Sequence, residues 1–307
     1  MSKTLLIYER AVPITKARHG NWGVKIENDF GFARNVNSMP LLAQEFRSAV
    51  REYPIVFAGL EEQIMPVILL GIRDSENLYI DESNRWNSKY IPAFARRYPY
   101  VFSSADQGKT LTLCIDEEFK GISQDGDGER LFTEEGEQTP YLDSVLEFQK
   151  EYQKLFQRTQ TFCKHLRELN LLDSMQAQLN LDSGEQMAIA GFMAVNRDRL
   201  KELSAEKLSE LSGLDELELI YLHLHSMLNV SELASRIKPG AGDISASVGE
   251  AGASEIPTTH TPKKIKSSSG VKGSSTRKKK SVAAKKKAAS VKPGNKSRNK
   301  SARKKRG

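Results

Sequence analysis

A continuously apolar run at residues 64–72, rich in branched side chains, is the strongest pattern in the chain. The apolar segment 53–57 precedes it, and the polar residues 73–76 separate it from segment 77–81. An apolar run of this length, bounded by turn residues, is typical of a strand that is covered on both faces. The sequence therefore predicts a sheet with 53–57 and 64–72 at its centre and a further strand at 77–81.

Weaker patterns predict the other strands. Residues 110–116 alternate between polar and apolar side chains, as expected for a strand with one buried face. Further strands are predicted at 5–8, in a turn-and-strand segment at 19–26, briefly at 131–132, and at 177–181 and 187–195 on either side of a polar turn.

The longest helical pattern begins at Thr139 and Pro140, because Thr is a favourable N-cap and Pro is tolerated in the first turn. Apolar residues continue at three-four spacing to Leu172. At about 1.5 Å per residue, this predicts a helix of roughly 50 Å. A helix of that length must cross the domain or lie along the sheet.

Shorter helices are also predicted. One begins at Pro40, buries Leu42, Phe46 and Ala49 on one face, and ends before 53–54. Another covers about 92–97. Two short helices follow residue 195, the second with Ser204 as N-cap, and an apolar helix runs from a capping box of Asp215 and Glu218 to Met227. Together these elements predict an α+β fold, with a mixed or mainly antiparallel sheet packed against the long helix and the C-terminal helices.

Charge divides the chain into two parts. Residues 263–307 contain 19 of the 46 Lys and Arg and none of the 39 Asp and Glu, so residues 1–262 have a net charge of −12. From residue 238 onward the composition is dominated by Gly, Ser, Ala, Pro and Lys, which is typical of disorder. We therefore predict a globular domain at 1–237, a flexible linker at 238–262 and a disordered basic tail at 263–307.

The basic tail predicts binding to nucleic acid or another polyanion. Its clustered side chains are Lys263, Lys264, Lys266, Arg277, Lys278, Lys279, Lys280, Lys285, Lys286, Lys287, Arg303, Lys304, Lys305 and Arg306. Such residues release counterions from phosphates, without sequence preference and with a steep dependence on salt. The Lys, Ala and Pro content is similar to that of linker-histone tails. A solubilising tail, or one that contacts the acidic domain, is the alternative.

A polar pocket is the second hypothesis for function. Arg96 and Arg97, followed by Tyr98, could hold a carboxylate or phosphate, or could instead form internal ion pairs with Glu45 or Asp116. The candidate pocket residues are His19, Glu45, Arg96, Arg97, Tyr98, Asp116 and His223. If these groups converge, they could supply an acid/base pair and an anion clamp for an enzyme or a small-ligand protein.

The sequence contains only incomplete matches to catalytic, metal-binding and cofactor-binding motifs. Gly108-Lys109-Thr110 lacks the glycine-rich loop of a phosphate site, and Arg130 stands where the calcium loop begun by Asp125 requires Gly. His223 and His225 lie about 200° apart on a helix, and Ser204 with Lys207 lacks the companion motifs of penicillin-recognising enzymes. We therefore predict no catalytic residues, no metal and no cofactor.

The cellular setting follows from what the chain contains. Cys114 and Cys163 lie in apolar contexts without ligand spacing, which favours a reducing compartment. The N-terminal apolar run is too short for a signal peptide, and no window approaches the roughly 18 to 20 apolar residues of a membrane span. We expect a cytoplasmic protein.

Short phrases in a fixed order resemble the SapC family of bacterial proteins over about residues 5–237. These short motifs lie, in chain order, at residues 8–19 (including 11–13), 40–46, 53–57, 66–78, 90–99, 113–116, 191–192 and 219–224. The family is named for an association with a bacterial surface layer, and the resemblance carries over no catalytic residues. It implies a SapC-like accessory protein, with the basic tail as an addition.

Overall fold

The computed structural model of the chain describes residues 6–104, 106, 109–180, 184, 186–237 and 246–247. All of these residues belong to one compact unit, Met1–His260. The predicted tail at 263–307 lies outside the described residues. So does the predicted linker at 238–262, except for the short strand β12 (Ala246–Ser247).

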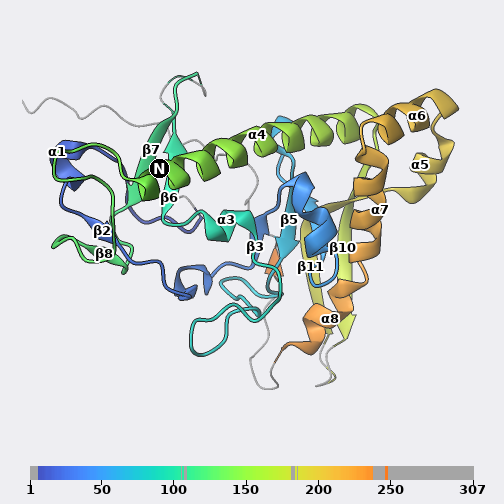
Figure 1. Cartoon of the computed structure of the whole chain (residues 1–307). Coiled ribbons are helices and arrows are strands. Elements are labelled where there is room, and N and C mark those ends of the chain that lie inside the picture. Colours follow the sequence, from blue (N-terminus) through green and yellow to red (C-terminus); the bar gives the residue numbers. More distant parts are fainter. Residues whose placement is uncertain are drawn as a thin grey trace, which may run out of the picture. The chain divides into compact units, whose positions relative to one another are not determined.

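The predicted strands at 53–57 and 64–72 lie inside the largest sheet, as expected (Figure 1). They form β4 (Ile55–Ala58) and β5 (Met65–Leu69), and every residue of both strands is buried. The sheet has the order β10-β11-β4-β5-β3, in which β10 is Leu172–Asn180, β11 is Gln186–Val195 and β3 is Ser38–Pro40. All of these neighbours pair antiparallel, whereas β12 pairs parallel with β11.

Two smaller antiparallel sheets complete the strands. One has the order β1-β7-β6, in which β1 is Ala11–Pro13, β7 is Thr112–Asp116 and β6 is Tyr100–Ser103. The other has the order β8-β2-β9, in which β8 is Ile122–Ser123, β2 is Gly23–Val24 and β9 is Glu129–Arg130. The α+β class and the mainly antiparallel pairing are therefore confirmed.

The long helix α4 (Pro140–Glu168) begins as predicted, with the Thr139 hydroxyl accepting a hydrogen bond from the Leu142 N–H at 3.3 Å. Its length is about 43 Å. Leu142, near its start, is buried in the smaller apolar core, whereas Phe156 and Leu166 are buried in the larger one. Helix α4 therefore packs across both cores, and it contacts β6 and β5 along the way (Figure 1).

The other helices are short. They are α1 (Lys16–His19), α2 (Phe46–Ala49), α3 (Ala93–Arg96), α5 (Arg197–Glu202), α6 (Ala205–Gly213), α7 (Glu216–Ser226) and α8 (Asn229–Ser235), with 3-10 turns η1 (Gly31–Ala33), η2 (Ala43–Glu45) and η3 (Glu61–Gln63). Helix α7 packs against α2, β4 and β11. Among the described residues, no helix is both long and apolar enough to cross a membrane.

The predicted end of the long helix, at Leu172, is wrong. The helix stops at Glu168 because Asn170 adopts a left-handed conformation, with φ of 52°. The N–H of Leu171 then donates to the Leu166 carbonyl, and the N–H of Asn170 to that of Arg167, each at 2.9 Å. This pair of bonds is a Schellman motif. It turns the chain into β10, which begins at residue 172.

The predicted strand at 77–81 is also wrong. The side chain of Asn77 accepts from the Tyr79 N–H at 2.9 Å and donates to the Ala33 carbonyl at 2.9 Å. This local bonding competes with a sheet ladder, and the segment keeps only a bridge between Ile80 and Trp86. Residues 6–7 likewise form a turn rather than part of a strand at 5–8, of which 5 lies outside the described residues.

The predicted helix start at Pro40 is wrong as well, whereas α7 begins after Asp215 as predicted but without the predicted capping box. Pro40 ends β3, and the helical segment begins at Ala43, although Leu42, Phe46 and Ala49 are buried as predicted. Asp215 forms no capping box, because it adopts a φ of 61° in the two-residue link between α6 and α7. Asp tolerates this left-handed conformation better than most residues. Ser204, by contrast, caps α6 as predicted, by accepting from the Lys207 N–H.

Candidate functional site

Asp116, at the end of β7, holds three chain segments together. Its side chain is fully buried and accepts hydrogen bonds from the backbone N–H groups of Glu9 at 2.8 Å, Arg10 at 2.9 Å and Glu118 at 3.2 Å. It also accepts from the Tyr98 hydroxyl at 3.3 Å. A buried carboxylate is costly unless hydrogen-bonded, and these four donors meet that requirement. The structure thus brings together two predicted site residues, Tyr98 and Asp116.

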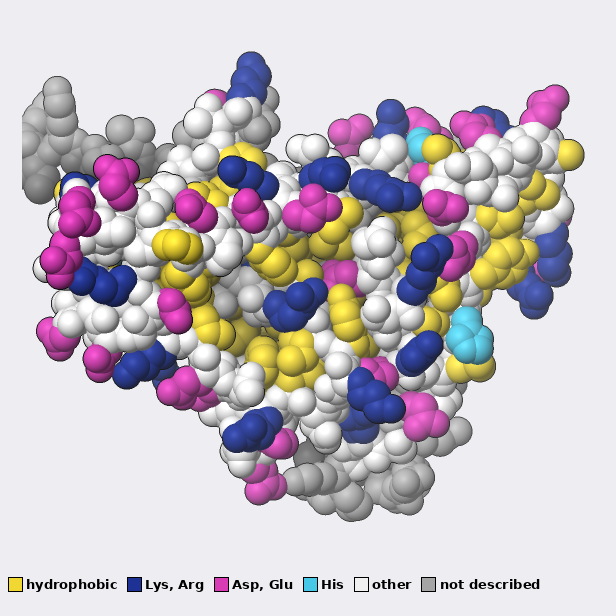
Figure 2. All heavy atoms as spheres, in the orientation of Figure 1, with side chains coloured by type: hydrophobic (Ala, Val, Ile, Leu, Met, Phe, Trp, Pro, Cys, Tyr) yellow, Lys and Arg dark blue, Asp and Glu magenta, His cyan; other side chains and the backbone are white. Residues whose placement is uncertain are grey.

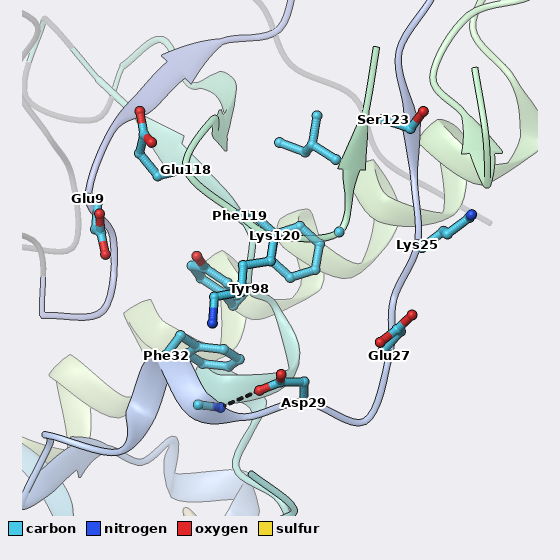
Figure 3. A pocket seen from close by; sticks show the side chains of 13 residues that line it. Glu9, Lys25, Glu27, Asp29, Phe32, Tyr98, Glu118, Phe119, Lys120 and Ser123 are labelled. Carbon is cyan, nitrogen blue, oxygen red and sulfur yellow. Dashed lines mark hydrogen bonds between the residues drawn. The ribbon is translucent and has the colours of Figure 1, made fainter. Parts of the chain in front are cut away.

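Tyr98 lies beside a cavity of about 400 Å³, here called the Tyr98 pocket (Figure 3). The lining comes from Glu9 before β1, from segment 25–32 after β2, from Tyr98 after α3, and from segment 118–123, which follows β7 and includes β8. The volume falls within the range of about 300 to 1,000 Å³ that is common for ligand sites.

Three aromatic rings are grouped at the pocket. The rings of Phe32 and Tyr98 stack with centroids 4.1 Å apart and an interplanar angle of 25°. Phe119 meets Tyr98 edge to face, with centroids 5.4 Å apart. Burial, followed by the nearby Asp116 carboxylate, raises the pKa of Tyr98 above its ordinary value. The phenol therefore stays neutral at physiological pH and serves as a hydrogen-bond donor.

One close backbone approach shapes the wall of the pocket. The N–H of Lys25 donates to the Gly121 carbonyl at 2.8 Å. A Cβ at residue 121 would clash with the Lys25 carbonyl oxygen. Glycine is therefore required at residue 121 if segments 25–32 and 118–123 are to lie side by side.

The two adjacent arginines line a cavity of about 280 Å³ together with Tyr98, but their guanidinium groups pack differently. The guanidinium group of Arg97 is buried between the rings of Phe94 and Tyr152, 4.4 Å from each centroid. Arg96 is exposed, donates from Nε to the Ile91 carbonyl at 3.0 Å, and lies 5.5 Å from the Phe148 ring centroid. Arg97 therefore has a packing role here.

Glu45 supports the backbone around α3. Its carboxylate accepts from the Tyr90 hydroxyl at 2.6 Å and from the N–H groups of Ala93 at 2.7 Å and Leu42 at 2.9 Å. Burial raises its pKa, and these hydrogen bonds act in the opposite direction. Glu45 and Arg96 both line a small cavity of about 190 Å³ beside α4, which is separate from the Tyr98 pocket.

His19 and His223 are both fully buried, in different parts of the fold. The N–H of Thr15 donates to His19 Nδ1 at 3.1 Å, so Nε2 carries the proton and faces Glu117 at 3.2 Å. His223 lies between β4 and β11. Burial lowers the pKa of both histidines, for His223 to about 4. The seven predicted pocket residues therefore divide into separate groups rather than surrounding one pocket.

The sequence reasoning missed Phe32, Phe119, Glu9 and Glu27 of the Tyr98 pocket. These residues lie in segments without hydrophobic periodicity, so no local pattern indicates that they meet. The only sequence signal was the Asp116-Glu117-Glu118-Phe119 run directly after a predicted strand, because strand ends and the loops that follow often carry functional residues.

Charges on the face drawn in Figure 2 are intermixed, and hydrophobic side chains gather in a hollow near its middle. Lys and Arg do not form a separate field on this face. A single-sign basic surface is the usual electrostatic footprint of a nucleic-acid site. This face of the domain therefore lacks the usual electrostatic footprint of a nucleic-acid site.

Comparison with family models matches residues 14–233 to the model described as SapC. Searches among curated proteins and among solved structures found no match for the chain. The match covers the strands of the three sheets other than β1 and β12, the long helix, and the residues that line the Tyr98 pocket from segment 25–32 onward.

Proposed function

Because the chain belongs to the SapC family, we propose that it is an accessory protein of that family which binds polyanions, and nucleic acid in particular, through the basic tail at 263–307. The observation that carries this proposal is the charge division: 19 Lys and Arg without any Asp or Glu in the tail, against a net charge of −12 in residues 1–262. The proposal places the protein in the cytoplasm.

The acidic domain makes the tail the favoured contact. A domain with net negative charge repels a polyanion at long range, whereas clustered Lys and Arg release counterions from it. No aromatic residue interrupts the tail, so base stacking is not expected. The expected binding is therefore electrostatic, independent of sequence and steeply weakened by salt.

The test compares full-length chains. In one variant, the 14 clustered Lys and Arg of the tail are replaced by Gln; in the control, the exposed α4 residues Lys150, Lys154 and Lys164 are replaced instead. Binding to a labelled DNA duplex is measured at several salt concentrations. The tail variant should lose binding and most of the salt dependence, since each neutralised phosphate contributes about 0.9 to the slope of log K against log salt.

The control should bind as the wild-type chain does. Equal affinity and equal salt dependence of the wild-type and tail variants would overturn the proposal. Strong binding of polyphosphate with negligible binding of DNA and RNA at the same salt concentration would contradict the assignment to nucleic acid.

A second candidate function is the binding of a small ligand near the Arg96-Arg97-Tyr98 segment. The observation that favours it is the position of Tyr98 beside a cavity of about 400 Å³ with a cluster of aromatic rings. In this second candidate function Tyr98 lines the binding site, and Asp116 positions Tyr98 by accepting a hydrogen bond from its hydroxyl. Arg96 and Arg97 do not line this pocket; they line another cavity, of about 280 Å³, which Tyr98 also borders.

A further inference from the structure

We propose that the Tyr98 pocket binds an organic cation, namely a group of the alkylammonium, guanidinium or quaternary ammonium class. The proposal rests on the second candidate function and is independent of polyanion binding by the tail. It is carried by two features that occur together at the pocket: grouped aromatic rings and an excess of carboxylates.

The aromatic rings supply the surface that a cation prefers. A cation within about 6 Å of a ring centroid is attracted by the negative face of the ring. The stacked pair of Phe32 and Tyr98 and the perpendicular Phe119 present rings in two orientations at one cavity. An alkyl chain attached to the charged group would gain further from burial against the same rings.

The carboxylates give the pocket a net negative charge. Glu9, Glu27, Asp29 and Glu118 line it together with only two lysines, a net charge of −2. Glu9 and Glu118 lie on one side of Tyr98 in Figure 3, and Glu27 and Lys25 on the other.

Existing contacts leave part of this negative charge available. Asp29 accepts from the Gly31 N–H, and Glu118 pairs with Arg10 at 2.8 Å. Within the part of the chain that the structure describes, Glu9 and Glu27 have no ion-pair partner. A ligand cation could therefore approach two carboxylates on opposite sides of the rings.

The lysines have unequal effects on such a ligand. Lys25 Nζ lies 3.3 Å from the carboxylate of Asp127, outside the pocket lining, so its charge is partly compensated. Lys120 has no ion-pair partner among the described residues. Its ammonium group would repel a bound cation, or compete with it for the carboxylates. Removal of this charge should therefore strengthen binding of a cation and weaken binding of an anion.

The test uses probes matched in length and the full chain. Binding of n-butylammonium, n-butanol and n-butyrate is titrated by ligand-observed NMR at low ionic strength. The cation should bind about 2- to 30-fold more tightly than the alcohol, the range that corresponds to cation–π attraction from exposed to desolvated sites. Phe119→Leu should reduce this preference for the cation.

Variants of the charged lining residues test whether the pocket favours a cation or an anion. Glu9→Gln and Glu27→Gln should each weaken n-butylammonium binding about 2- to 5-fold, as expected for exposed charge pairs, and Lys120→Met should strengthen it by a similar factor. Glu147→Gln, on the exposed side of α4, changes the net charge equally and should have no effect. Reversed signs, with n-butyrate as the better ligand, would overturn the cation assignment while the pocket kept its binding function. Absence of binding for all three probes would overturn both.

The cation could be a free molecule or a Lys or Arg side chain of the tail, and the full-length Gln variant of the tail separates these sources. If a tail side chain occupies the pocket, n-butylammonium binds more tightly to this variant than to the wild-type chain. If the ligand is a free molecule, the two chains bind it equally. Weaker binding to the Gln variant would overturn the proposal, because the probe would then depend on the tail rather than on the pocket.

Discussion

The imidazole of His223 accepts a hydrogen bond from the backbone N–H of Val195, at the end of β11, at 3.0 Å. Its other nitrogen, Nδ1, donates to the carbonyl of Ile55 at 2.7 Å. Met193 and Phe57 are paired between β11 and β4, so Val195 and Ile55 would be paired two residues further along the ladder. The ring bridges them instead. Accepting at one nitrogen and donating at the other requires the neutral form of His223.

Folding should therefore weaken as the pH falls. Burial lowers the pKa of His223 to about 4, whereas a histidine in the unfolded chain has a pKa of about 6.5. Between these values the unfolded state binds more protons, so the free energy of unfolding decreases as the pH drops through this window. From pH 7 to pH 5 the expected loss is about 2 kcal/mol, measured by urea unfolding followed by circular dichroism.

Two variants isolate this contribution. His223→Gln should be less stable at pH 7 but should lack most of the further loss at pH 5. His225→Gln, which changes an exposed residue on the same helix, should retain it. His19 adds a residual slope of the same sign, since burial also lowers its pKa. Parallel pH curves for His223→Gln and the wild-type chain would contradict the prediction.

Periodicity sufficed where the structure depends on local burial. It identified β4, β5, β7 and most of α4, because their buried side chains form continuous, alternating or three-four patterns against the two cores. It failed where a single polar residue decides the backbone, as at Asn77 and Asn170. The side chain of Asn77 forms a hydrogen bond with the local backbone, whereas Asn170 adopts a positive φ, and neither behaviour leaves a repeating pattern.

Asn170 provides a test of the signal that ends α4. Its φ of 52° is in the left-handed region, which is unfavourable for residues other than glycine. Asn170→Gly should raise the free energy of unfolding by up to about 1 kcal/mol, and Asn170→Ala should lower it by about 1 kcal/mol. Chemical denaturation measures both. Equal stability of the Gly and Ala variants would show that the left-handed turn does not form.

Both cysteine thiols should resist modification in the folded chain. Cys114 and Cys163 are free and buried, and burial raises the pKa of each thiol. Because the thiolate is the reactive form, neither should react with a thiol reagent such as DTNB within minutes at pH 7.5, whereas both should react at once in denaturant. Rapid reaction of one thiol without denaturant would contradict its buried position.

The site was only partly predictable, for a physical reason. Tyr98 and Asp116 stood out because a tyrosine beside two arginines, and a carboxylate at a strand end, are unusual in apolar surroundings. Their meeting depends on the β6–β7 pairing, and β6 was not among the predicted strands. Phe32 reaches Tyr98 from a segment more than sixty residues earlier, by tertiary packing alone. The grouping of seven residues failed because burial places His19 and His223 in separate parts of the fold.

Asp116 links stability to the proposed ligand pocket, so Asp116→Asn should affect both. One amide NH₂ would replace an oxygen that now accepts two hydrogen bonds: either those from Glu9 and Tyr98, or those from Arg10 and Glu118. Buried donors without an acceptor cost about 1 to 3 kcal/mol each. The free energy of unfolding should therefore fall by about 2 to 6 kcal/mol, whereas Asp125→Asn, in an exposed loop, should change it by less than about 0.5 kcal/mol.

The affinity for n-butylammonium distinguishes a role of Asp116 in positioning the pocket residues from a general loss of stability. At a temperature where Asp116→Asn is fully folded, its affinity for n-butylammonium should be reduced, because either Glu9 and Tyr98 or Glu118 lose their hydrogen bonds to residue 116. Tyr98→Phe keeps the aromatic ring and loses only the hydroxyl bond to Asp116, so it should bind the probe nearly as well as the wild-type chain. A folded Asp116→Asn variant with unchanged affinity would show that the buried carboxylate stabilises the domain without organising the pocket.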